Sequence, residues 1–86
     1  MYYVYLIQNL INRKIYTGFS NNLRKRISDH IKGRVWTTKR FRKLKLIYYE
    51  AFINEKDARE REMYLKTTKG KRTVRLMLKN TFAPFV

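Results

Sequence analysis

Apolar and polar residues follow one another in blocks that predict three short strands. Residues 2–8 read YYVYLIQ, with apolar side chains at both alternating positions, which is typical of a strand in the middle of a sheet. Residues 9–13 carry two asparagines and should turn, and residues 14–17 should return as a second strand, so the two form a hairpin. Residues 46–52 begin with LIYY and predict a third strand.

The first helix is predicted from a four-residue spacing of apolar side chains. Leu23, Ile27 and Ile31 recur behind the polar residues 20–22, which are typical N-cap types. This spacing predicts a helix with a narrow apolar stripe. We expect Gly33 to end it, since glycine is the usual residue just beyond a helix.

Two more helices are expected in the second half of the chain. Asn54 is a plausible N-cap for a helix that continues to about Lys69, where Gly70 interrupts it. A further helix is expected over about 72–80, and residues 82–86 should fold back on the core. The order ββαβαα predicts an α+β fold: a small three-stranded antiparallel sheet flanked by about three helices, in a single domain.

The charge balance adds a partner class to this fold. The 86 residues include 21 Lys and Arg against 6 Asp and Glu, a formal net charge of +15. A field of this size attracts polyanions, so we expect nucleic acid and not a membrane as the partner. The absence of cysteine and the single histidine exclude disulfides, thiolate zinc sites and multi-histidine metal cages. With no candidate membrane span or signal peptide, we expect a cytoplasmic, nucleoid-associated protein.

Much of this charge falls in one run. Residues 32–45 are almost wholly basic, with Trp36 and Phe41 interleaved among the cations. We expect an exposed loop here. Such a loop suits a nucleic-acid surface, since aromatic rings stack on bases while cations bind phosphates.

Among the scarce carboxylates, Glu62 has the most informative position. At 100° per residue it shares a helix face with Ala58 and Leu65, within about 60°. A carboxylate on an apolar face needs a cation or a metal as its partner. A simple ion pair with Lys66, four residues on, is the alternative interpretation.

Four further side chains could carry chemistry. Arg26 and His30 are helical neighbours beside the apolar stripe, and the forked guanidinium of an arginine suits a phosphate. Tyr5 and Tyr16 lie on strands that we expect to pair, so their hydroxyls could flank a shared site. The alternatives are a solvated arginine, a histidine at the surface or at a helix end, and tyrosines that only fill the core.

The spacing of these residues resembles a known family. Residues 3–5 (YVY), residues 16–18 (YTG), Arg26, His30 and Glu62 resemble the motifs of the GIY-YIG endonucleases. The likeness is greatest to small stand-alone bacterial members with a URI-type domain, which are related to the N-terminal nuclease domain of the excinuclease C subunit.

The resemblance implies a role for each matched residue. Tyr5 would be the general base or would orient the attacking water, and Tyr16 would position water or phosphate. Gly18 would let the backbone turn closely into the site. Arg26 would stabilise the phosphorane, and Glu62 would bind one divalent ion, Mg²⁺ or Mn²⁺.

Some matches are auxiliary, and two residues depart from the motifs. His30 matches an auxiliary position, and Lys14 could lower the pKa of a nearby hydroxyl. Tyr5 would be a poor base at neutral pH unless its pKa is depressed, and both the dense positive charge and a metal ion could depress it. Tyr3 and Thr17 stand where the motifs usually have glycine and isoleucine, substitutions that are familiar in the small bacterial branch.

Taken together, the resemblance implies a metal-dependent DNA endonuclease acting on branched or damaged DNA in repair or recombination. The alternative is a non-catalytic module that binds DNA or, as a second choice, RNA. A protein partner could supply substrate specificity. Nucleic acid is expected to contact Lys14, Gly18, Asn22, Arg24, Lys25, Arg34, Trp36, Lys39, Arg40, Arg42 and Lys43.

Overall fold

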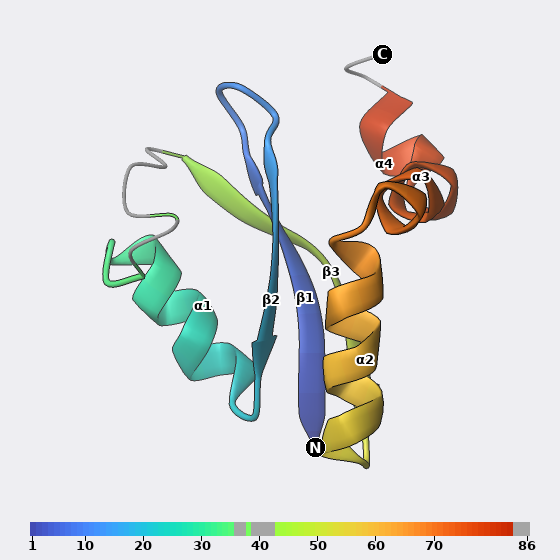
Figure 1. The fold of residues 1–86 in the computed structure, drawn as a ribbon. Helices are drawn as coiled ribbons and strands as arrows, with labels where there is room; N and C mark the ends of the chain where they lie inside the picture. The colour runs from blue at the N-terminus through green and yellow to red at the C-terminus, as the bar shows by residue number, and fades with distance from the viewer. Residues whose placement is uncertain (36–37, 39–42, 84–86) are drawn as a thin grey trace.

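The computed structural model describes residues 1–35, 38 and 43–83. Within these residues, three strands and four helices follow one another (Figure 1). They are β1 (Tyr2–Asn9), β2 (Ile15–Ser20), α1 (Leu23–Ile31), β3 (Leu44–Phe52), α2 (Glu55–Leu65), α3 (Thr68–Met77) and the short α4 (Lys79–Phe82). The predicted α+β fold and the order ββαβαα are confirmed.

The sheet has the order β2-β1-β3 and is antiparallel throughout. β1 is the central strand, as its doubly apolar pattern predicts. In this register Tyr5 pairs with Gly18 on one side and with Tyr49 on the other. Because side chains alternate along a strand, Tyr5 and its neighbour Leu6 face opposite sides of the sheet.

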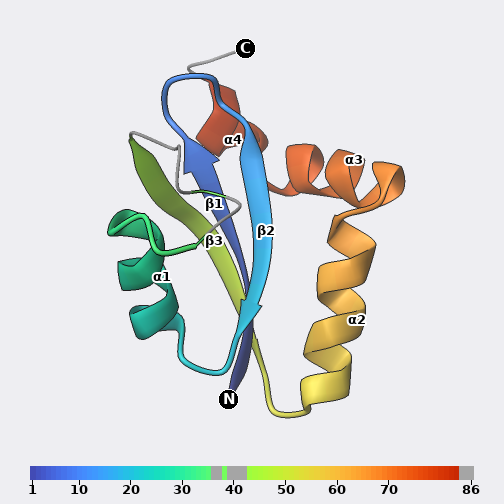
Figure 2. The same cartoon turned by 60° about the vertical axis from the view of Figure 1, so that its left-hand side comes forward.

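The two faces of the sheet carry different helices. Figure 2 shows β2 at the outer edge, with α1 on one side and α2 on the other. The main core lies on the α2 side, where Val4 and Leu6 of β1 are buried against Ala58, Leu65 and Val74. Apolar burial on that side holds α2 and α3 to the sheet and leaves the α1 side free for polar side chains.

The corner between α2 and α3 differs from the prediction. α2 ends at Leu65, and Gly70 lies inside α3 instead of separating two helices. The Thr67 hydroxyl caps α3 by accepting from the Gly70 amide at 3.0 Å. A Cβ at Gly70 would overlap the Tyr64 carbonyl oxygen, so the glycine permits close packing of the corner.

The apolar stripe predicted for α1 is wrong at its last member. Ile31 is 67% exposed, whereas His30 is buried. Asn22 caps the helix, its side chain accepting from the Lys25 amide at 3.2 Å. Gly33, at φ 72°, follows the end of the helix as expected.

The basic run is not simply an exposed loop. Val35 and Thr38 are buried, and β3 already begins at Leu44. Trp36, Lys39, Arg40, Phe41 and Arg42 lie outside the described residues, as do residues 84–86 of the tail. None of the helices in the described ranges is long and apolar enough to cross a membrane.

Candidate active site

Tyr5 occupies the centre of the α1 side of the sheet. Its side chain is completely buried, and its ring lies against the backbone of Gly18 on β2. A Cβ on Gly18 would overlap the ring of Tyr5. Gly18 therefore lies inside a strand and leaves space for the Tyr5 ring because it has no side chain. The expected backbone turn into the site is not what this glycine provides.

A directed chain of hydrogen bonds runs through the Tyr5 hydroxyl. Arg26 Nε lies 3.3 Å from Tyr5 Oη, which lies 2.8 Å from His30 Nε2. His30 Nδ1 is 2.6 Å from Thr38 Oγ1. A guanidinium only donates, so the Tyr5 oxygen accepts from Arg26 and its proton is free to donate to Nε2. His30 then carries its proton on Nδ1 and donates to Thr38.

Tyr16 completes the cluster from β2. Its ring centroid lies 5.1 Å from that of His30 and 6.3 Å from that of Tyr5. The rings of Tyr5 and His30 are themselves edge to face at 5.5 Å. Four of the five side chains that the sequence singled out, those of Tyr5, Tyr16, Arg26 and His30, thus lie together.

Glu62 approaches from α2, on the other side of the sheet. Ala58 and Leu65 are buried on the same helix, which confirms the predicted face. The Glu62 side chain is 16% exposed and pairs with Lys66 Nζ at 3.1 Å, so the simpler interpretation is also realised. The negative charge of Glu62 nevertheless acts on the tyrosine cluster, because it is one of the causes that raise the pKa of Tyr5.

The comparison with known proteins decides the family. The model of the GIY-YIG catalytic domain matches residues 1–75. The chain belongs to the GIY-YIG family. The YVY and YTG segments on β1 and β2 are therefore its two GIY-YIG motifs, and the resemblance found in the sequence is confirmed.

Several small bacterial proteins are similar to this GIY-YIG chain. The UPF0213 protein of Clostridium perfringens is 42% identical over 67 residues, 77% of this chain and 71% of that protein. The UPF0213 protein of Limosilactobacillus reuteri is 38% identical over 68 residues, 76% of this chain and 70% of that protein. The Staphylococcus haemolyticus relative is 36% identical over 67 residues, 77% and 80% of the two chains. No solved structure was found to match.

Burial sets the protonation states in this GIY-YIG site. It raises the pKa of Tyr5 to about 12, against the lowering effect of Arg26. In the protein alone, the positive charge therefore does not depress this pKa below its ordinary value. Burial, with Arg26 nearby, also lowers the pKa of His30 to about 4. At neutral pH the site thus holds a protonated phenol against a neutral imidazole.

The hydrogen bond between Arg26 and Tyr5 also changes the pKa of Arg26. It is the main cause that raises the pKa of Arg26. A contact with Tyr16 acts in the same direction, so the guanidinium is charged and directed at both tyrosines. Its remaining N–H groups form a cationic fork beside the two hydroxyls.

Glu62 is the residue that could hold a metal ion in this site. Within the described ranges no three His, Cys, Asp or Glu side chains gather around a common point. Mg²⁺ typically takes one or two carboxylates and keeps several waters, so a single carboxylate fits this ion. Binding would require Lys66 to leave the carboxylate, which an exposed lysine does at small cost.

The other described residues expected to contact nucleic acid do not join the tyrosine cluster. Asn22 is engaged as the cap of α1, and Lys25 and Arg34 both pair with Asp29, at 3.1 and 3.6 Å. Lys14 lines a groove next to β2 on the α2 side of the sheet. Two more are exposed at the surface, Arg24 and Lys43.

Thr38 is the site residue that sequence reasoning missed. It is completely buried, and its hydroxyl is hydrogen-bonded to Nδ1 of His30. It lies in the basic run, where neighbouring cations suggest a solvated loop. No periodicity links a loop residue to a helix residue eight positions earlier, so the sequence carried no signal for this contact.

Proposed function

We propose that this GIY-YIG protein is a metal-dependent DNA endonuclease acting on branched or damaged DNA. The observation that supports this most is the buried chain from Arg26 through Tyr5 to His30, with Tyr16 beside it. A chain that begins on a cationic fork and ends on a neutral imidazole suits phosphodiester hydrolysis. It offers a phosphate ligand at one end and a proton acceptor at the other.

The attacking water would be oriented by the Tyr5 hydroxyl. That oxygen accepts from Arg26 and would offer a further lone pair to a water admitted beside Arg26 with the substrate, while its proton would be donated to His30. As the water oxygen bonds to phosphorus, its proton passes to Tyr5 Oη and the phenol proton passes to His30 Nε2. The P–O bond to the leaving oxygen breaks, and that oxygen takes a proton from solvent.

Arg26 supplies the electrostatic part of the reaction. Its free N–H groups would bind the equatorial phosphate oxygens, where negative charge accumulates in the transition state. Phosphate binding also offsets the positive charge that helps to lower the pKa of His30. The imidazole thereby becomes a better proton acceptor when substrate is bound.

Glu62 would hold the divalent ion, Mg²⁺ or Mn²⁺. A bound ion supplies Lewis-acid stabilisation of phosphate oxygens. The low side-chain exposure of Glu62 and its electrostatic effect on Tyr5 support this role.

A non-catalytic DNA-binding module is the second candidate. The observation that favours it is the Glu62–Lys66 ion pair, which occupies the carboxylate that a metal would need. In that case the fold and the positive charge would serve binding alone.

Cleavage assays separate the two functions. Blunt, nicked, flapped and four-way-junction DNA are incubated in Mg²⁺, Mn²⁺ or EDTA. We expect metal-dependent cleavage, lowered by roughly 100-fold or more in Arg26→Ala and in Glu62→Ala. Matched controls are Arg72→Ala and Glu60→Ala, which remove the same charges from exposed positions. Cleavage that persists in Arg26→Ala and Glu62→Ala contradicts the site, and binding without cleavage of any substrate supports the second candidate.

A further inference from the structure

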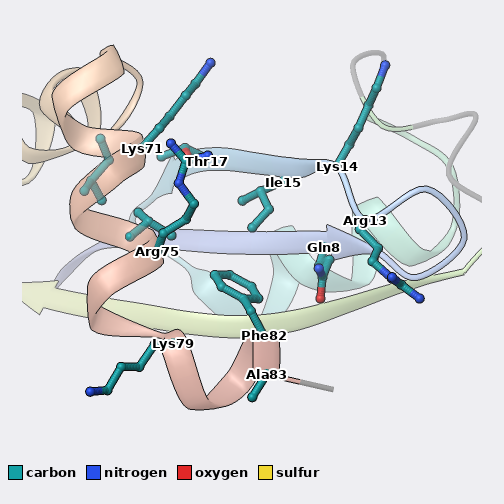
Figure 3. A pocket seen from close by; sticks show the side chains of 12 residues that line it. Gln8, Arg13, Lys14, Ile15, Thr17, Lys71, Arg75, Lys79, Phe82 and Ala83 are labelled. Atoms are coloured by element: carbon teal, nitrogen blue, oxygen red, sulfur yellow. The ribbon is translucent and has the colours of Figure 1, made fainter. Parts of the chain in front are cut away.

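A large groove lies on the side of the sheet opposite Tyr5. It is bounded by the ends of β1 and β2 and by α3 and α4, and its volume is about 1050 Å³ (Figure 3). Ligand pockets usually measure about 300–1,000 Å³. The groove therefore has room for more than one ring-sized group. We refer to it as the basic groove.

The floor of the basic groove is apolar. Ile15 of β2, Leu65 of α2, Val74 of α3 and Phe82 of α4 line it. Phe82 is half-buried and packs against the core, and Figure 3 shows its ring reaching from α4 towards the strands. An aromatic ring on an open apolar floor is a surface on which a flat group can stack.

The rim of the groove is positively charged. Five cations line it: Arg13, Lys14, Lys71, Arg75 and Lys79. None of the six carboxylates of the chain does. Among the described ion pairs, none involves Lys14, Lys71, Arg75 or Lys79. These four rim cations therefore present positive charge that no ion pair within the described residues neutralises.

The basic groove and the tyrosine site share one edge strand. Thr17 lines the groove, while its neighbours Tyr16 and Gly18 face the α1 side. Among the described strands, β2 pairs with β1 alone and lies at the edge of the sheet. A chain-like ligand bound at Tyr16 therefore needs to cross only the width of one strand to enter the groove.

We propose that the basic groove binds an unpaired DNA strand next to the bond that is cut. Phosphates would contact the rim, and one or more bases would lie on the floor against Phe82. Single-strand sites combine a cationic track with an aromatic stacking surface in this way. The role next to the scissile bond rests on the proposed function, because it assumes that the tyrosine site cuts DNA.

An unpaired strand fits the groove better than a duplex does. The bases of a duplex are stacked inside the helix, so a duplex would satisfy the rim and leave the apolar floor uncovered. An unpaired strand offers both charged phosphates and exposed base faces. The substrate class this implies is DNA that carries a single-stranded branch or tail.

Binding in EDTA tests this inference without any cleavage. The probes are a fluorescein-labelled duplex with a single-stranded tail of about 10 nucleotides and the same duplex without the tail. The groove variant is Lys71→Ala with Arg75→Ala. Its control is Lys56→Ala with Arg72→Ala, which removes one lysine and one arginine from exposed positions outside the groove.

We expect the groove variant to bind tailed DNA about 10-fold more weakly than the control does, because two phosphate contacts are lost. Both variants should bind the blunt duplex equally well. The inference would be overturned if the groove variant and the control lost equal affinity for tailed DNA. It would also be overturned if the groove variant lost affinity for phosphatidylglycerol vesicles and not for tailed DNA. This test measures binding and no cleavage. A protein that binds as expected but cleaves no DNA would therefore contradict only the proposed function.

A second variant tests the floor of the groove. Phe82→Leu keeps an apolar side chain against the core but removes the ring. With 2-aminopurine in the tail, we expect wild-type protein to quench the probe by stacking and Phe82→Leu to lose most of that quenching. Quenching that is the same in both proteins would show that no base stacks on Phe82.

Discussion

At the scale of single residues, the candidate site depends on one absent side chain and one buried imidazole. Gly18 leaves the space that the Tyr5 ring fills, and the ring carries its hydroxyl to His30. Thr38 then holds the far nitrogen of that imidazole. Each contact fixes the next, so small changes at any of these positions should affect the whole chain of hydrogen bonds.

Gly18→Ala tests the space under the Tyr5 ring. The added Cβ overlaps the ring, so we expect a loss of about 1–3 kcal/mol in the free energy of unfolding and a large loss of cleavage. Urea unfolding measures the first quantity. In a Tyr5→Ala background the same substitution should cost much less, because the ring is gone. Equal costs in both backgrounds would contradict the steric explanation.

The low pKa of His30 predicts acid sensitivity. The unfolded chain binds a proton near pH 6.5 and the folded chain only near pH 4, so stability is full above 6.5 and falls as pH decreases towards 4. The total loss should reach about 3 kcal/mol. Urea unfolding at pH 7 and 4.5 measures it, and His30→Gln should remove most of the difference.

Thr38→Val removes the acceptor for the His30 Nδ1 proton. We expect a loss of about 1–3 kcal/mol in unfolding free energy, because a buried N–H is left unpaired. We also expect slower cleavage, since Nε2 is no longer held as the acceptor for Tyr5. Thr38→Ser keeps the hydroxyl and should retain most of both properties. A serine variant as impaired as the valine variant would argue for a packing role.

At the scale of helices and strands, close backbone packing joins α2 to α3. Gly70 lies in the first turn of α3 and meets the Tyr64 carbonyl at the end of α2. The corner places α3 so that Lys71 and Arg75 reach the basic groove. The geometry of this corner therefore decides whether the groove exists.

Gly70→Ala should destabilise the protein although alanine is the better helix former. Helix propensity alone would favour alanine by about 1 kcal/mol. The overlap with a backbone oxygen, which cannot rotate away, should outweigh that gain. We expect a lower midpoint of urea unfolding than in wild type, whereas exposed Arg72→Ala should change stability by less than about 0.5 kcal/mol. A stabilised Gly70→Ala protein would contradict this packing.

The parts of the fold that the sequence predicts are those with a local cause. The central position of β1 follows from its doubly apolar pattern, and Asn54 and Gly33 mark helix ends through backbone chemistry. The interior position of Gly70 does not follow, because it depends on contact with another helix. The exposure of Ile31 does not follow from the sequence either, because α1 buries His30 in place of Ile31.

The candidate site, like the fold, could be predicted from the sequence only in part. The spacing of Tyr5, Tyr16, Arg26 and His30 allowed these residues to be selected together, and they lie together. The direction of the shift in the Tyr5 pKa does not follow from the sequence, because the sequence shows charge but not burial. Burial is the larger cause here and raises this pKa.

At the scale of the whole molecule, positive charge far exceeds negative charge. The formal net charge of +15 exceeds what the chain can pair internally, since only six carboxylates are present. Long-range attraction of DNA is therefore built into the domain, whatever strand geometry it prefers.

DNA binding should depend steeply on salt. Between 50 and 200 mM salt we expect the affinity for duplex DNA to fall by about 10³-fold, the loss that accompanies six or more phosphate contacts. Fluorescence anisotropy in EDTA measures it. A flat salt profile would show that contacts other than phosphate pairs dominate binding.

The burial of His30 in α1 has a consequence for heat inactivation. Among the residues of this helix His30 is the buried one, so the side chain that seats α1 on the sheet also belongs to the proposed reaction centre. The helix cannot detach while the centre stays intact. Release of α1 would therefore disassemble the proposed reaction centre, and loss of the proposed cleavage activity on warming would report the detachment of one helix.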